Sequence, residues 1–215
     1  MRLRHSAFPI PHPAIAMRLF VAVNLPSEIR DRLAVVQESL RRAQADVSWV
    51  RAENIHVTLK FLGETEEKRL GRIRPALIQV AGAGTPFSME LAGVGSFGGR
   101  TPRVVWVGVE DGAEPLTQLA GRVEAALAHV GFAKERRGFT AHLTLGRVRS
   151  PRNSEALLAA LQGFHAEKFG GFTAAQFELM QSELRPTGSV YTVLDRFPLV
   201  TPEGEETGQE ERHAS

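Results

Sequence analysis

Two short segments carry residues whose types and spacing suit acid–base chemistry. Each places a histidine two positions before a threonine, His56 with Thr58 and His142 with Thr144, inside an apolar run that favours a β-strand. Because side chains alternate across a strand, the imidazole and hydroxyl of each pair lie on one face, about 7 Å apart. Two such strands side by side would form a pocket with two titratable groups and two hydroxyl donors. That combination suits acid–base chemistry on a phosphate.

The alternate positions of both strands are expected to face a core, namely Ile55, Val57, Leu59, Phe61, Leu143 and Leu145. Arg147 has the opposite parity to His142, but it stands at the strand end, from where a long side chain could still reach a phosphate. Lys60 shares the parity of His56 and is a second cationic candidate. The two threonines could be ordinary β-formers, but their hydroxyls lie on the histidine side.

The two motifs belong to a longer internal repeat. His56 and His142 are 86 residues apart (142 − 56), and the apolar strand 19–23 matches 105–109 at the same offset. The helical apolar stripe in 29–40 matches that in 116–127 at an offset of 87. A repeat of this length indicates two similar lobes related by a pseudo-two-fold axis. Such an axis would bring the two motif strands together, with a cleft between the lobes.

Apolar periodicity and turn residues predict an α+β fold with two mostly antiparallel sheets and flanking helices. The helices are expected at 27–45, with Ser27 as N-cap, at 66–81, where Pro75 should kink or restart the helix, at 114–130 and at about 154–161. The strands are expected at 19–24, in the first motif to about 63, and at 87–97, 104–109, 139–147, 172–184 and 190–197. Strand 19–24 is almost continuously apolar, so we expect both its faces to be buried.

The amino-acid composition excludes several classes of catalytic and metal-binding chemistry. The chain has 215 residues and no cysteine, which excludes disulfides, thiolate nucleophiles and cysteine metal sites. The lack of cysteine fits a reducing cytoplasm, where we expect the protein to act, and no run approaches the length of a membrane span. The 26 basic residues include 22 arginines, a side chain suited to two-pronged phosphate recognition. Arginine could equally replace lysine on a solvated surface.

The two ends differ in composition from the middle. Residues 1–16 contain three prolines that interrupt a short apolar stretch, so a disordered extension is favoured over a signal peptide. Residues 201–215 carry five glutamates and one arginine and are expected to be a disordered acidic tail. The net charge is +2, so the remainder carries +2 − (−4) = +6. One bilobal domain is therefore expected over 17–200.

Other readings of the same residues are less favoured. Single histidines on a sheet are most often structural, and a metal site would need a carboxylate or third histidine that neither motif carries nearby. The string Gly93-Val-Gly-Ser-Phe-Gly98 fits a dinucleotide fingerprint, but a turn and a strand follow it where a helix is required. Trp49, Trp106 and Phe97 are candidates for stacking on a base, although strand aromatics more often belong to a core.

The paired motifs, the opening 18–26 (RLFVAVNLP) and the segments 54–64 (NIHVTLKFLGE), 139–147 (FTAHLTLGR) and 182–191 (SELRPTGSVY) resemble the two-histidine phosphoesterase superfamily. The likeness covers about residues 17–200. It is greatest to the bacterial and archaeal RNA 2′,3′-cyclic phosphodiesterases, also called the 2′-5′ RNA ligase family. That family often has proline where this chain has Ala141.

The resemblance implies a metal-independent and cofactor-free hydrolysis of RNA 2′,3′-cyclic phosphates to 2′-phosphomonoesters. His142 would accept a proton from water, and His56 would donate one to the departing O3′. Thr58, Thr144 and Arg147 would bind the phosphate oxygens. Because one imidazole must be neutral and the other protonated, a bell-shaped pH profile is expected.

Two hypotheses stay open at this point. The first is the hydrolase, acting as a monomer on RNA ends or cyclic nucleotides and away from membranes, with 2′-5′ ligation as a reverse reaction. The second is a non-catalytic module that binds RNA ends or nucleotides on the same scaffold. Loss of one motif histidine would have pointed to the second, but both are present.

Overall fold

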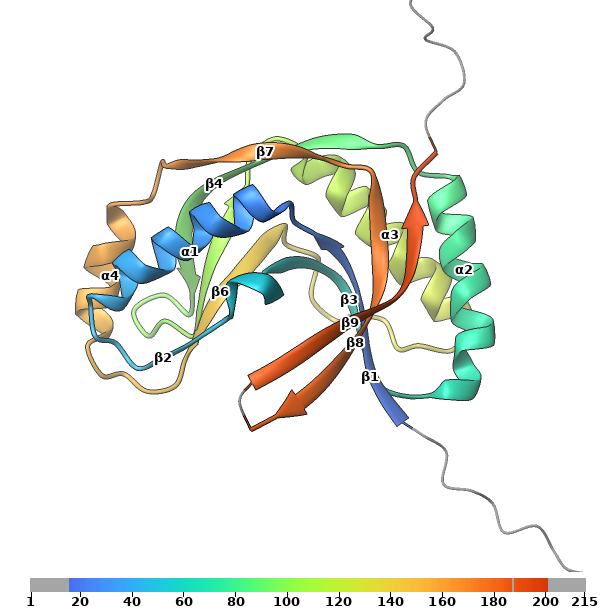
Figure 1. The fold of residues 1–215 in the computed structure, drawn as a ribbon, viewed down its shortest axis with the longest axis horizontal. Coiled ribbons are helices and arrows are strands. Elements are labelled where there is room, and N and C mark those ends of the chain that lie inside the picture. Colours follow the sequence, from blue (N-terminus) through green and yellow to red (C-terminus); the bar gives the residue numbers. More distant parts are fainter. Residues whose placement is uncertain (1–15, 187, 201–215) are drawn as a thin grey trace, which may run out of the picture.

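The computed structural model describes residues 16–186 and 188–200. The expected disordered segments before residue 17 and after residue 200 lie outside these ranges, except for Ala16. Ala16 is the first residue of the first strand and pairs with Glu66, so the folded part begins one residue earlier than expected. The described chain forms a strongly curved sheet with helices packed against it (Figure 1).

The elements follow the predicted order for an α+β fold. They are β1 (Ala16–Asn24), α1 (Ser27–Arg41), β2 (Val47–Trp49), β3 (His56–Glu66), α2 (Leu70–Gly82), β4 (Phe87–Phe97), β5 (Val104–Val109), α3 (Ala113–His129), β6 (His142–Val148), α4 (Ser154–Gln162), β7 (Lys168–Ala174), β8 (Gln176–Arg185) and β9 (Gly188–Pro198). Short 3-10 turns at Ala52–Asn54 and Glu67–Arg69 precede β3 and α2. Within the described ranges, no helix is both long enough and apolar enough to cross a membrane.

Several details differ from expectation. The strand expected at 172–184 is two strands, β7 and β8, and β7 already begins at Lys168. Glycine permits close strand packing here, since a Cβ on Gly171 would lie 2.8 Å from the Met89 carbonyl oxygen. Helix α1 ends at Arg41, and its N-cap is Pro26 rather than Ser27. Helix α2 continues through Pro75, which removes a single backbone hydrogen bond, instead of restarting there.

The sheet has nine strands within the described chain and a symmetric order. It runs β7-β4-β5-β6-β3-β1-β8-β9, with β2 paired to β6, and every pairing is antiparallel. The strands related by the repeat, β1 with β5 and β3 with β6, occupy equivalent places in the two four-stranded halves. The halves join where Val57 pairs with Leu143. The two expected sheets are therefore two lobes of one continuous sheet.

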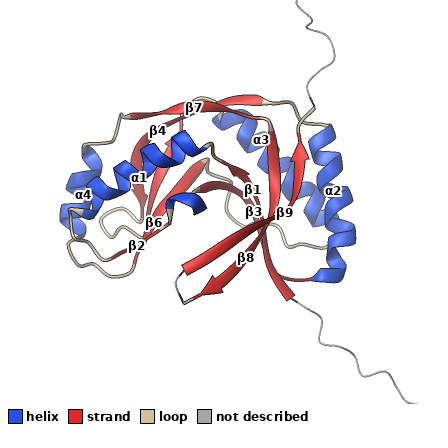
Figure 2. Ribbon diagram, in the orientation of Figure 1, coloured by secondary structure: helices blue, strands red, loops and turns tan. Residues whose placement is uncertain are grey.

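The long helices exchange lobes (Figure 2). Helix α1 follows β1, but its Arg32 donates to the Phe169 carbonyl on β7, and its Gln37 amide donates to the Leu145 carbonyl on β6. Helix α3 follows β5, but it packs against β3 and lies beside α2. Each lobe is thus covered by a helix that comes from the other half of the repeat. This exchange ties the lobes together and holds the β3–β6 junction.

Strand β1 is buried on both faces, as its continuous apolar sequence predicted. Leu19, Val21 and Val23 belong to the main core. Phe20 and Ala22 point to the opposite face, where they pack with Met180 of β8 and with Tyr191 and Val193 of β9. This second, smaller cluster supports one side of the site described next.

Candidate active site

The junction of the lobes brings the two motif strands side by side. Val57 and Leu143 pair in antiparallel orientation and are both fully buried. In that register, the histidine of each motif lies across from the threonine of the other. All four of these side chains share the face of the sheet opposite to Val57 and Leu143. His56 and His142 line the same cavity. The internal repeat therefore produces one site with approximate two-fold symmetry.

Hydrogen bonds fix the tautomer of both imidazoles in the same way. Nδ1 of His56 donates to the Asn54 carbonyl at 2.7 Å, and Nδ1 of His142 donates to the Thr140 carbonyl at 2.8 Å. A carbonyl only accepts, so Nδ1 carries the hydrogen and Nε2 is the atom left for proton exchange. Nε2 of His56 is also 2.9 Å from the Thr58 hydroxyl, which donates to it while the ring is neutral.

The two rings have different surroundings. His56 stacks on Phe20 with ring centroids 4.8 Å apart, and Tyr191 meets it edge-on at 5.4 Å. Burial in this aromatic slot lowers the pKa of His56, partly opposed by the hydrogen bond to the Asn54 carbonyl. His142 has one aromatic contact among the described residues, an edge-on approach of Phe97 at 5.0 Å. The site is symmetric in its reactive groups and asymmetric in their environment.

The cavity has a volume of about 570 Å³ and contains every residue that the sequence singled out for the site: His56, Thr58, His142, Thr144 and Arg147. Sequence reasoning missed much of the remaining wall. Tyr191 comes from β9, Glu124 from α3 and Arg137 from the segment before β6. None of these three residues belongs to a sequence pattern around either motif that would have identified it.

A β-bulge in each motif strand decides which side chains follow the histidine and threonine into the cavity. The register of β3 against β1 skips Leu59, and that of β6 against β5 skips Leu145. Each extra residue reverses the alternation of faces. Arg147 therefore lies on the cavity side without having to reach round the strand. Its repeat partner Phe61 (147 − 86) is 53 % exposed and also lines the cavity, so its expected place in the core was wrong.

The bulge in β3 also changes the face on which Lys60 lies, so Lys60 is no longer a candidate for phosphate binding. Its side chain is 1 % exposed, and Nζ forms a 2.7 Å ion pair with Glu124. Nζ also donates to the Ala133 carbonyl at 2.9 Å. Lys60 therefore links β3 to α3 and to the segment that leads into β6, and its positive charge is paired with Glu124.

The three aromatic candidates for base stacking do not line the cavity. Arg41 covers the Trp49 ring at 5.3 Å. The Trp106 ring lies over Gly95, where an added Cβ would come within 2.4 Å of it, and Phe97 packs beside the same ring at 5.4 Å. The aromatic residues that line the cavity are instead Phe61, Phe139 and Tyr191.

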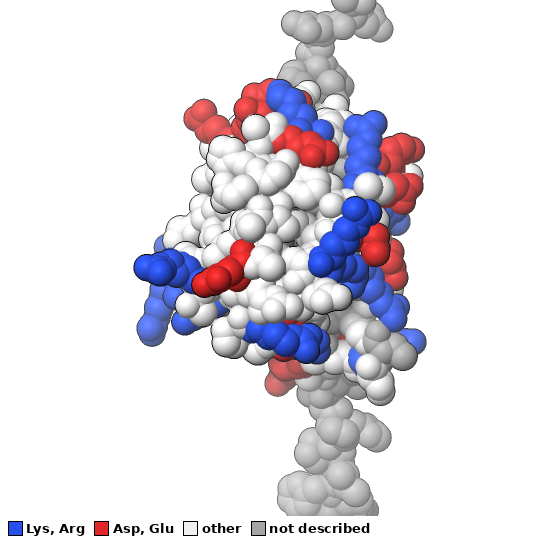
Figure 3. Space-filling view, turned by 90° about the vertical axis from the view of Figure 1, so that its left-hand side faces the viewer, with Lys and Arg blue, Asp and Glu red and all other residues white. Residues whose placement is uncertain are grey.

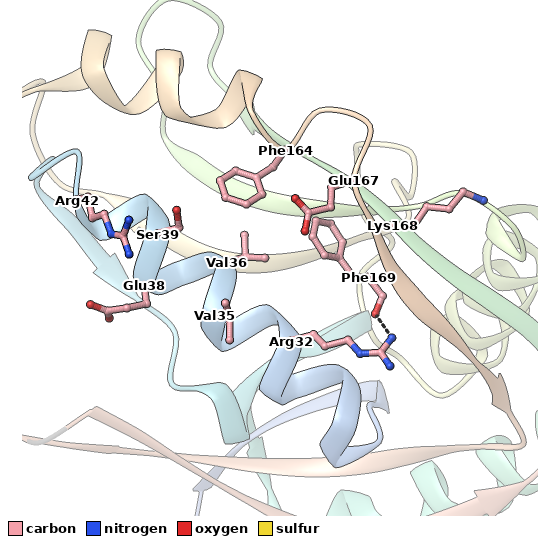
Figure 4. Close-up of a pocket in the computed structure, with 10 residues that line it drawn as sticks. All are labelled: Arg32, Val35, Val36, Glu38, Ser39, Arg42, Phe164, Glu167, Lys168 and Phe169. Carbon is pink, nitrogen blue, oxygen red and sulfur yellow. Dashed lines mark hydrogen bonds between the residues drawn. The ribbon is translucent and has the colours of Figure 1, made fainter.

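A second hollow of about 500 Å³ lies between α1 and residues 164–169 (Figure 4). Val35, Val36, Phe164 and Phe169 give it an apolar wall, and no histidine lines it. It shares no residue with the histidine cavity. Nor do three His, Asp or Glu side chains gather to hold a metal anywhere in 16–186 and 188–200. The cavity at the junction, by contrast, is lined by both motif histidines.

Two lobes related by an internal repeat, with a His-x-Thr motif from each at their junction, define a bilobal protein of the two-histidine class. The chain belongs to the 2′-5′ RNA ligase superfamily, whose family model matches residues 25–185. The match spans both motifs and all of the cavity walls except Tyr191.

Similar proteins support this membership along nearly the whole chain. An RNA 2′,3′-cyclic phosphodiesterase of Archaeoglobus fulgidus is 39 % identical over 182 residues, which cover 84 % of this chain and 99 % of that protein. A crystal structure of a Thermus thermophilus protein superposes with a TM-score of 0.73 at 32 % identity, covering 86 % of this chain and all of the other. The structure of E. coli LigT with 3′-AMP gives 0.68 at 28 % identity, covering 87 % of this chain and all of LigT.

Proposed function

We propose that this protein hydrolyses the 2′,3′-cyclic phosphate ends of RNA to 2′-phosphomonoesters by metal-independent acid–base catalysis. The observation that carries the proposal is the pair of histidines that line one cavity, each with Nδ1 bound to the carbonyl of the residue two positions before it. Both rings thereby keep Nε2 for the reaction. The phosphodiesterase names of the relatives over almost their full length support the same substrate class.

In the proposed reaction His142 and His56 act on opposite sides of the phosphorus. Nε2 of His142 takes a proton from water as the water oxygen attacks phosphorus. The P–O3′ bond breaks, and Nε2–H of His56 delivers a proton to O3′, leaving the phosphate on O2′. Each proton transfer contributes roughly 10²–10⁴ in rate. With the 5′-hydroxyl of another RNA in place of water, the same step forms a 2′-5′ linkage.

Three side chains are suited to bind the phosphate. The hydroxyls of Thr58 and Thr144 share the histidine face and can donate to non-bridging oxygens. Arg147 can offer two N–H groups to the same anion, because the bulge turns it into the cavity. No ion pair of Arg147 exists within the described chain, so its charge is available.

The protonation of His56 depends on the substrate. Burial favours the neutral imidazole in the free protein, whereas a proton donor must be charged. A bound phosphodiester anion supplies the missing partner, since a nearby opposite charge raises the pKa of an imidazole. The Thr58 hydroxyl, which donates to Nε2 in the free protein, can then turn to the phosphate.

Incubation with a 2′,3′-cyclic mononucleotide tests the proposal. We expect turnover to the 2′-phosphate, unchanged by a metal chelator and resolved from the 3′-isomer by phosphorus NMR. Product with phosphate on O3′ would contradict the assigned leaving group. Loss of turnover with chelator, restored by a divalent ion, would contradict metal independence.

The pH dependence gives a second expected result. Because burial lowers the pKa of His56, the limb of the bell-shaped kcat/KM profile that reports His56 should lie below pH about 6.5, the ordinary histidine pKa. The same limb should move to higher pH in the kcat profile, since bound phosphate raises that pKa. The limb should vanish in His56→Gln. Identical limbs in both profiles would show that the substrate does not shift His56.

A further inference from the structure

Three cations beside the cavity have no part in the proposed chemistry. Lys134, Arg136 and Arg137 lie in the segment that joins α3 to β6, and all three are exposed. Within the described chain none of them forms an ion pair. Glu135 stands between them, so residues 134–137 carry three positive charges and one negative charge, a net of +2. We call residues 134–137 the rim segment.

On another face of the molecule several cations lie close to acidic side chains. The face shown in Figure 3, over α4 and the adjoining ends of α1 and β2, places Lys and Arg close to Asp and Glu. There Arg149 pairs with Asp46 at 2.8 Å, and Arg41 pairs with Glu38 at 3.6 Å. Such mixing is typical of a solvated surface. The cations of the rim segment form no such ion pair within the described chain, a property shared by other exposed arginines such as Arg42. What distinguishes the rim segment is its place at the edge of the cavity.

Contacts with β3 and α3 hold the backbone of the rim segment in place. The Ala133 carbonyl accepts from Nζ of Lys60 at 2.9 Å, and the Glu135 N–H donates to Oε1 of Glu124 at 3.0 Å. Lys60 and Glu124 are themselves joined by an ion pair, in which Lys60 is buried and Glu124 is 23 % exposed. Just before them, the Arg69 guanidinium lies 3.7 Å from the centre of the buried Phe132 ring. The backbone is therefore tied to β3 and α3, while all three cations are exposed and Arg137 lines the cavity.

The rim segment leads directly into the catalytic strand. Arg137 lines the cavity, as do Gly138, Phe139 and Thr140 after it, and His142 follows at once. A phosphate between the two histidines is already matched by the threonine hydroxyls and Arg147. Cations at the edge of the cavity and just outside it are therefore placed to meet further phosphates, which a mononucleotide does not have and an RNA strand does.

We propose that the rim segment binds the phosphodiester backbone of the RNA strand whose cyclic end occupies the cavity. This inference rests on the proposed function and names its substrate class, an oligoribonucleotide rather than a small cyclic nucleotide. Arg136 and Lys134 contact backbone phosphates as the strand leaves the cavity, and Arg137 contacts the one nearest the reacting end. Such contacts carry little sequence information, so strand length and salt control them.

The test compares kcat/KM for a cyclic mononucleotide and for oligoribonucleotides of increasing length with 2′,3′-cyclic phosphate ends. The rim variant is Lys134→Gln with Arg136→Gln, since neither residue lines the cavity. The matched control is Arg42→Gln with Arg152→Gln, two exposed arginines beside α1 and α4. We expect the wild type and control to prefer longer RNA, and the rim variant to lose that preference while keeping its mononucleotide rate.

Salt provides the quantitative measure. Each phosphate contact to single-stranded RNA contributes a slope of about −0.7 to the logarithmic salt dependence, so two lost contacts change it by about 1.4. Between about 50 and 200 mM salt, the oligomer kcat/KM of the wild type should fall about 7-fold more than that of the rim variant. Absence of length dependence in the wild type, or its persistence in the rim variant, would overturn the inference.

The proposed function and the RNA-binding role of the rim segment can fail independently of each other. If no cyclic phosphate turns over, fluorescence anisotropy with the same RNAs decides the inference by binding alone. Salt-dependent affinity that grows with length and is lost in the rim variant would support it. Equal affinity of the rim variant and the control for every RNA would reject it.

Discussion

Replacement of His142 by alanine should lower kcat/KM on a cyclic-phosphate substrate roughly 10²–10⁴-fold, or about 3–5 kcal/mol of barrier. The variant lacks the group that removes the proton from the attacking water, while Thr144 and Arg147 still bind the phosphate. The His142 ring is partly exposed and its hydrogen bond is to a single carbonyl, so its loss should hardly affect folding. Initial rates, with product binding measured separately, would show lost turnover and retained affinity.

His129→Ala is the matched control for this change. His129 is an exposed histidine at the end of α3 whose Nδ1 also donates to a carbonyl, that of Ala125, at 2.7 Å. It does not line the cavity, so its variant should keep the wild-type rate. A His142→Ala protein as active as the His129→Ala control would mean that another group activates the water.

Replacement of His56 should have an effect of similar size, but one that depends on the leaving group. With the natural substrate, His56→Gln should lose roughly 10²–10⁴ in rate, because O3′ departs without a proton. When sulfur replaces the bridging O3′, the leaving thiolate needs no proton, since thiols ionise near pH about 8.5. On that substrate the loss should shrink to about tenfold or less. Rates on the oxygen and sulfur substrates, measured side by side, give the comparison.

Glutamine is preferred to alanine here because His56 packs against Phe20 and Tyr191, and a smaller side chain would leave a hole. The His142→Ala variant serves as the control, because a better leaving group does not replace a missing base. Its deficit should be the same on both substrates. If sulfur instead rescued His142→Ala and left His56→Gln impaired, the two histidines would have exchanged roles.

Much of the site could be predicted from local sequence because strand alternation is a local property. A two-residue spacing puts His56 and Thr58 on one face whatever the strand pairs with. The 86-residue repeat then indicates that two such faces meet, since equivalent segments of a duplicated fold occupy equivalent places. The continuous apolar run of β1 likewise predicted two buried faces, and the structure shows them.

The positions beyond the threonines depended on contacts that the local sequence does not contain. Lys60 and Phe61 exchanged their expected faces because β3 bulges against β1, and a bulge is defined by the register with a neighbouring strand. The burial of Lys60 requires Glu124, which is 64 residues away. Tyr191 reaches the cavity because β9 lies beyond β8 and β1 in the sheet.

The sequence by itself determined which groups the candidate site offers: two imidazoles and two hydroxyls, each pair set on one face of a strand by a period of two. The tertiary structure alone decided what surrounds those groups. It set the aromatic slot of His56, the approach of Arg147 and the anchored rim segment, because each arises where strands and helices distant in sequence pack together. Alternation follows from the geometry of a single strand, whereas bulges, ion pairs and cavity walls require a partner.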